Sequence, residues 1–105
     1  MNTKEFVKGF YKEKQNFLTE YLSENPESEV GHLIKSLNLT DQQSDVMKKI
    51  MDGTLTDIFY TILLGLDGCA SIGGTQELYD LKDENGNQLS GEIEGYAYEY
   101  FHESD

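Results

Sequence analysis

The chain has 105 residues, enough for one hydrophobic core, and we expect a single domain over residues 1–105. Its eight basic residues are all lysine, and with 20 acidic residues they give a net charge of −12. Because a phosphate backbone is bound by lysine and arginine, this composition excludes direct binding of nucleic acid.

Cys69 is the only cysteine, so no disulfide can form within the chain. The N-terminal residues are polar and lack the basic-then-apolar order of a signal peptide. The longest apolar run, residues 58–66, is interrupted by Thr61 and Gly65 and is too short to cross a bilayer. We therefore expect a cytoplasmic protein that does not contact membranes.

The first predicted element is a long helix. Apolar residues between Phe6 and Leu22 recur with helical spacing, with Thr3 as the N-cap and the pair Asn25–Pro26 as the stop. The spacing places the lysines on the outer face, namely Lys4, Lys8, Lys12 and Lys14.

A short second helix is predicted next, with Pro26 in its first turn and apolar residues spaced for one face from Val30 to Leu37. A third helix begins at the capping box Thr40–Gln43 and ends at Gly53, which favours a left-handed exit. Its predicted core face consists of Val46, Met47, Ile50 and Met51.

A fourth, central helix is predicted at about residues 55–66, because residues 58–64 are apolar nearly all round. The glycine-rich segment 65–74 reads as a loop, and Asn85–Gly86 favours the tight turn of a β-hairpin. A last helix carries Ile93, Ala97 and Phe101 on one face. The sequence thus predicts an α+β, mainly helical fold of four to five helices with one small β-hairpin at about residues 78–90.

The acidity lies in the second half of the chain. Residues 1–52 carry seven lysines and nine acids, whereas residues 53–105 carry one lysine and eleven acids. Near the C-terminus, carboxylates alternate with tyrosines, which are enriched in protein interfaces. We predict a partner-binding surface of Glu92, Glu94, Tyr96, Tyr98, Glu99 and Glu103. The alternative is a solvated face that serves solubility, with the tyrosines packed into the core.

Other chemical sites find little support in the sequence. In a calcium-loop register that pairs Gly86 with Glu92, the first ligand position falls on Leu81, which has no carboxylate. His32 and His102 have no ligand spacing to each other or to Cys69, so we expect no metal and no cofactor. A second function class is nevertheless open: a small-ligand or thiol-dependent site at the 65–74 loop, with Cys69 or Ser71 lining it.

In composition, a small acidic chain with outward tyrosines is similar to bacterial immunity proteins and other inhibitors that cover basic enzymes. This likeness implies a non-enzymatic interaction protein whose partner is basic, for example a nuclease or a nucleic-acid-binding protein, with mimicry of DNA charge as its extreme form. A homodimer through the first helix is a further expectation, if the apolar stripe of that helix exceeds what the core absorbs.

Overall fold

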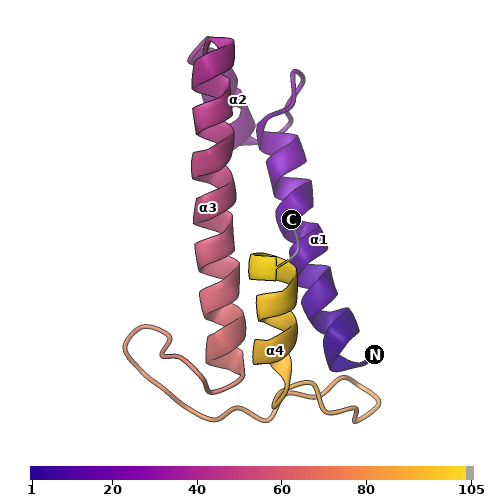
Figure 1. Cartoon of the computed structure of the whole chain (residues 1–105). Coiled ribbons are helices and arrows are strands. Elements are labelled where there is room, and N and C mark those ends of the chain that lie inside the picture. Colours follow the sequence, from indigo (N-terminus) through magenta and orange to yellow (C-terminus); the bar gives the residue numbers. More distant parts are fainter. Residues whose placement is uncertain (104–105) are drawn as a thin grey trace.

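Three helices, each begun by a polar side chain, form the first two thirds of the chain (Figure 1). In the computed structural model, which describes residues 1–103, they are α1 (Thr3–Tyr21), α2 (Glu29–Ser36) and α3 (Asp41–Leu66). The capping box of Thr40 and Gln43 is confirmed at the start of α3. The predicted N-cap of α1 is one residue off, because Asn2 caps the helix and the buried Thr3 hydroxyl donates to the Leu89 carbonyl at 3.0 Å.

The turn between α1 and α2 is held by Glu20, whose carboxylate accepts the backbone amides of Glu27 and Ser28. The hydrogen bond from the Ser28 side chain, followed by the backbone amides of Ser28 and Glu27, lowers the pKa of Glu20. Pro26 is buried before the helix begins, and Ser28 is the N-cap of α2. The prediction that Pro26 lies in the first turn of that helix is therefore wrong.

The third and fourth predicted helices are one helix, α3, of 26 residues. It runs through Gly53 without a break, and Thr54 donates its hydroxyl to the Ile50 carbonyl instead of capping a new helix. A break there would leave about four amides and four carbonyls without partners, a larger cost than the roughly 1 kcal/mol of one helical glycine. The C-terminal half of α3 is not buried all round, because Ile58 and Ile62 are exposed on one side of it.

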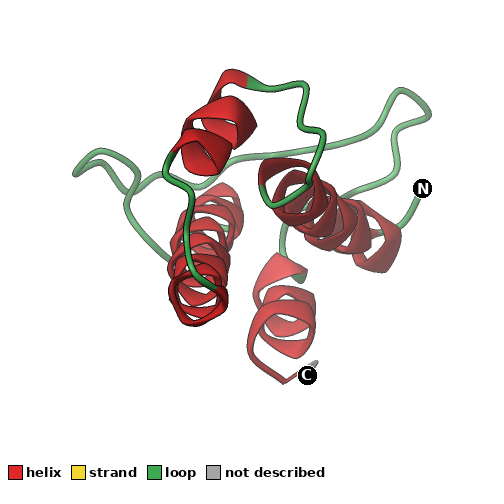
Figure 2. Ribbon diagram, turned by 90° about the horizontal axis from the view of Figure 1, so that it is seen from above, coloured by secondary structure: helices red, strands yellow, loops and turns green. Residues whose placement is uncertain are grey.

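The hydrophobic core lies where α1, the C-terminal half of α3 and the last helical segment meet. That segment consists of α4 (Ile93–Tyr98) and a π-helical turn, η1 (Glu99–Glu103). Figure 2 shows α2 and α4 on opposite sides of the α1–α3 pair. The buried cluster consists of Val7, Leu63, Ile93, Ala97 and Phe101, with partly buried aromatic rings around it.

A lysine is part of this interior. Lys14 is 5% exposed, its ammonium lies 2.7 Å from an Asp52 carboxylate oxygen, and the rings of Tyr11 and Phe101 lie 5.5 and 5.7 Å away. The outer-face prediction for Lys14 is therefore wrong. The charge of a lysine alone predicts exposure to solvent, whereas here the ion pair and the two ring faces stabilise the ammonium inside the bundle.

The predicted β-hairpin at residues 78–90 is also wrong, and with it the α+β class, although the mainly helical character is confirmed. Within residues 1–103 no strand forms, and Lys82 and Gln88 make only an isolated bridge. The Ser90 hydroxyl accepts the Leu81 amide at 3.0 Å and donates to the Tyr79 carbonyl at 3.0 Å. A side chain thus occupies the backbone groups that a second strand would have paired.

Asp67, the C-cap of α3, connects this long segment to α4. Its carboxylate accepts the backbone amides of Gly91 and Glu94, the latter at 3.0 Å. Since Glu92 at the start of α4 makes no side-chain capping bond, Asp67 supplies the acceptor that the helix start needs. The end of α3 therefore positions α4.

Candidate interaction surface

The spacing of apolar residues in α4 and η1 decides which side chains face outward. Ile93, Ala97 and Phe101 recur every fourth residue and are buried against α1 and α3. Of the residues between them, Glu94, Tyr98 and Glu99 are exposed, whereas Tyr96 and Tyr100 are partly buried against the core. This placement follows from the spacing noted in the sequence.

Five of the six predicted partner-binding residues are exposed: Glu92, Glu94, Tyr98, Glu99 and Glu103. Tyr98 is 49% exposed, the largest fraction of any tyrosine ring in α4 and η1. Tyr96 is half-buried and packs against the core cluster, so its ring is mainly structural. We call the five exposed residues, together with the exposed His102, the acidic–aromatic face.

One flank of this face is aromatic and reaches across to α3. Tyr98 lies one turn after Glu94, and its ring centroid is 5.6 Å from that of His102. The His102 ring meets Tyr60 of α3 edge-on at 4.4 Å. Tyr60 did not emerge from the sequence, because no local pattern indicates that residue 60 reaches the end of the chain. Burial, followed by the nearby Glu94 carboxylate, raises the pKa of the Tyr60 phenol.

The glutamates of the face take part in no ion pair of the described part of the chain. Within residues 1–103 the ion pairs involve Met1, Lys14 and Lys82, none of them with a glutamate of α4 or η1. Lys82, the one lysine of the second half, lies 3.2 Å from Asp80. The four carboxylates therefore present uncompensated negative charge to solvent.

Cys69, the centre of the alternative site, is exposed just after α3. Partial burial of its sulfur raises the pKa of the thiol, and the carboxylates of Glu94 and Asp67 raise it further. Because the thiolate is the nucleophilic form, these carboxylates oppose thiol chemistry at neutral pH. The structure brings Cys69 close to the carboxylates of Glu94 and Asp67.

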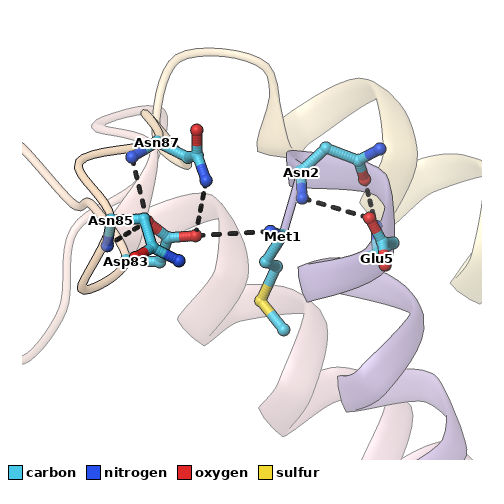
Figure 3. A network of polar contacts seen from close by, with 6 residues as sticks. All are labelled: Met1, Asn2, Glu5, Asp83, Asn85 and Asn87. Atoms are coloured by element: carbon cyan, nitrogen blue, oxygen red, sulfur yellow. Dashed lines mark hydrogen bonds and ion pairs between the residues drawn. The ribbon is translucent and has the colours of Figure 1, made fainter.

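Asp83 lies in the segment that was compared with a calcium-binding loop, and its carboxylate makes hydrogen bonds within the protein (Figure 3). Its carboxylate accepts the backbone amides of Asn85 and Asn87 and the side-chain amide of Asn87, each at 2.9 Å, and lies 3.3 Å from the α-amino group of Met1. The hydrogen bonds of Asn87 contribute most to lowering the Asp83 pKa to about 2. Across residues 1–103 no three acidic, histidine or cysteine side chains converge as a metal site.

Two hollows lie at the other end of the molecule, around α2 and the N-terminal half of α3. A cavity of about 600 Å³ is lined by the end of α1, by α2 and by the start of α3. A groove of about 440 Å³ runs over Leu39 and the first turns of α3. Neither is lined by residues 65–74, where the alternative site was expected.

Comparison of the chain with protein-family models, with curated proteins and with solved structures gives no match. Among residues 1–103, no helix is long and apolar enough to cross a membrane. The proposed function therefore rests on the surface features of the chain described above.

Proposed function

We propose that this chain is a non-enzymatic interaction protein of the inhibitor or immunity type, which binds a basic protein through its acidic–aromatic face. The observation that supports this most is the half-exposed Tyr98 ring among glutamates that form no ion pair within residues 1–103. Solubility alone explains carboxylates on a surface. The Tyr98 ring beside them adds an amphipathic aromatic side chain of the kind enriched in interface hot spots.

The face has the chemistry to capture lysine and arginine. Exposed carboxylates of one sign attract a basic partner over a distance and raise its association rate. A tyrosine face then provides apolar contact area and a site for a guanidinium. The partner class that fits is a nuclease or another nucleic-acid-binding protein, whose own function requires a basic surface.

The test uses the purified chain against a panel of purified basic proteins, including a ribonuclease and a histone, with an acidic albumin as the negative partner. A true partner loses affinity steeply as NaCl rises from 0.05 to about 0.5 M, because the Debye length shortens from about 14 to about 4 Å. Affinity that does not change with salt would contradict electrostatic capture.

Variants then locate the contact. The triple variant Glu92→Gln, Glu99→Gln, Glu103→Gln, and separately Tyr98→Ala, should each weaken binding about tenfold or more, as expected for interface residues. The matched control Glu13→Gln, Glu24→Gln, Glu84→Gln removes the same charge from exposed positions outside the face. If the control weakens binding as much as the first triple variant, general acidity and not this face is responsible.

A further inference from the structure

A surface far from the acidic–aromatic face is apolar and is left uncovered by the described residues 1–103. The outer side of α2 carries Val30, Leu33 and Leu37, which are exposed although they have the spacing of a buried helix face. Leu33 and Leu37 are 60% and 57% exposed. We call these three residues the α2 ridge.

A hollow of matching character adjoins this ridge. The groove of about 440 Å³ is lined by Leu39, Gln42, Gln43, Val46, Met47 and Ile50, and we call it the α3 groove. None of these residues is charged, in a chain where 27% of residues are. Only Asn38 lies between Leu37 of the ridge and Leu39 of the groove, so the two surfaces are neighbours.

The sequence places Val46 and Ile50 in the core, and the structure contradicts this, because both are 55% exposed. Helical spacing shows that one face of a helix is apolar but not that another element of the same chain covers it. Here α2 packs against α1, and the cavity of about 600 Å³ lies between it and the N-terminal half of α3.

The chain exposes more surface than a compact monomer of its mass. The accessible surface of the chain is 7148 Å², whereas a compact monomer of 11.9 kDa exposes about 6,000 Å². The difference, roughly 1,100 Å², is spread over the α2 ridge, the α3 groove and other exposed parts such as residues 71–80. The radius of gyration, 16.1 Å, also exceeds the roughly 13 Å of a compact domain of this length.

We propose that two copies of the chain form a two-fold dimer in which the α2 ridge of each copy enters the α3 groove of the other. In this two-fold arrangement both ridges and both grooves are occupied. No ridge or groove remains free to bind a third copy, so the assembly does not extend into a fibre. It differs from the dimer expected through α1, whose apolar stripe is largely absorbed by the core.

Charge favours a second copy as the occupant. The residues that line the groove include no carboxylate that would attract a basic partner. Residues 1–52 are also close to neutral, with seven lysines and nine acids. Figure 1 places α2 at the opposite end of the molecule from α4 and the long connection before it, along an extent of 47 Å. In this dimer the two strongly acidic halves therefore lie far apart, well beyond the ~8 Å Debye length of physiological salt.

Sedimentation equilibrium of the full chain across dilution tests the proposal. We expect a mass of twice 11.9 kDa at high concentration that falls toward 11.9 kDa on dilution. Dimerisation should persist or strengthen at about 0.5 M NaCl, in contrast to capture of a basic protein, because apolar contacts are not screened. A monomer at every concentration, or an open-ended series of larger species, would overturn the proposal.

Variants distinguish this contact from any other. Val46→Glu with Ile50→Glu should abolish the dimer while leaving the helical circular dichroism unchanged, because both residues are exposed. Leu78→Glu, which adds charge at an 87% exposed position outside both surfaces, is the control and should stay dimeric. A dimer that survives the groove variant overturns the placement.

A mixing experiment gives a second, independent outcome. The ridge variant Leu33→Lys, Leu37→Lys and the groove variant Val46→Glu, Ile50→Glu should each be monomeric. When they are mixed, one intact ridge meets one intact groove and the two altered surfaces carry opposite charge, so a heterodimer should form. If the mixture stays monomeric while the wild type dimerises, the ridge-in-groove contact is wrong.

Discussion

Lys14 differs from most lysines in that its side chain is buried. Most lysines are solvated, yet this ammonium lies inside the bundle with Asp52 as its ion-pair partner. The pair is asymmetric, because the Lys14 side chain is 6% exposed whereas that of Asp52 is 51% exposed. Replacing Lys14 and replacing Asp52 should therefore change the free energy of unfolding by different amounts.

Replacing Lys14 by Met should change the free energy of unfolding by less than about 1 kcal/mol, because Met fills the site and Asp52 remains hydrated. Asp52→Ala should cost roughly 2–3 kcal/mol, since it leaves a buried cation without its partner. Urea unfolding measures both changes, with the exposed Asp57→Ala on the same helix as the control. Equal losses for the two variants would show that Lys14 is not buried as described.

Asp83 gives the stability a pH dependence of defined sign. Its pKa of about 2 in the folded state lies below the ~3.9 of an unfolded chain, so ionised Asp83 stabilises the fold above about pH 4. That contribution is lost as the pH falls from about 4 to about 2, where the folded-state carboxylate is protonated.

Asp83→Asn should therefore be less stable than the wild type at pH 7, and the difference should shrink toward pH 2. Urea unfolding at several pH values measures this difference, with the exposed neighbour Glu84→Gln as the control. A difference that stays constant down to pH 2 would mean that the Asp83 charge is not what stabilises the connection.

Among the elements, α3 gives the sharpest contrast between local signals and the observed structure. Gly53 and the Thr54–Asp57 pattern indicate a boundary, yet the helix continues. Because nothing lies within 4 Å of a Cβ placed at Gly53, an alanine there enters free space.

Gly53→Ala should raise the free energy of unfolding by about 0.8–1 kcal/mol, the propensity difference between Gly and Ala in an exposed helix interior. Gly65→Ala on the same helix is the matched comparison, because its Cβ would collide with the Ile72 side chain, and it should destabilise the fold. Thermal unfolding of both variants measures the contrast. If Gly53→Ala instead lowers the stability, a break at residue 53 would be the better description.

Helix starts and buried faces could be predicted because their causes are local. The capping box at Thr40, the helical face of Ile93, Ala97 and Phe101, and the exposure of Tyr98 follow from neighbours in the sequence. The missing hairpin could not be predicted, because it depends on where the Ser90 hydroxyl points. The contacts of Lys14 with Asp52 and of Tyr60 with His102 join residues distant in the chain, which no spacing rule reveals.

For the whole molecule, the main feature is the separation of two surfaces along its 47 Å length. The acidic–aromatic face and the apolar surface of α2 and α3 lie toward opposite ends, so each can be altered without touching the other (Figure 1). Salt should weaken contacts at the first surface and spare those at the second. This opposite response separates the two proposals in a single titration.

The long connection between α3 and α4 also makes the chain divisible. Residues 71–80 are exposed throughout, and the described hydrogen bonds of Gln76 and Tyr79 reach Gly68 and Ser90, each on its own side of Glu77. Thr3 with Leu89 and Asp67 with Glu94 join the two sides without passing through this segment. A glutamate-specific protease that cuts after Glu77 should leave two pieces that stay together, and separately made fragments 1–77 and 78–105 should reassemble as a split protein.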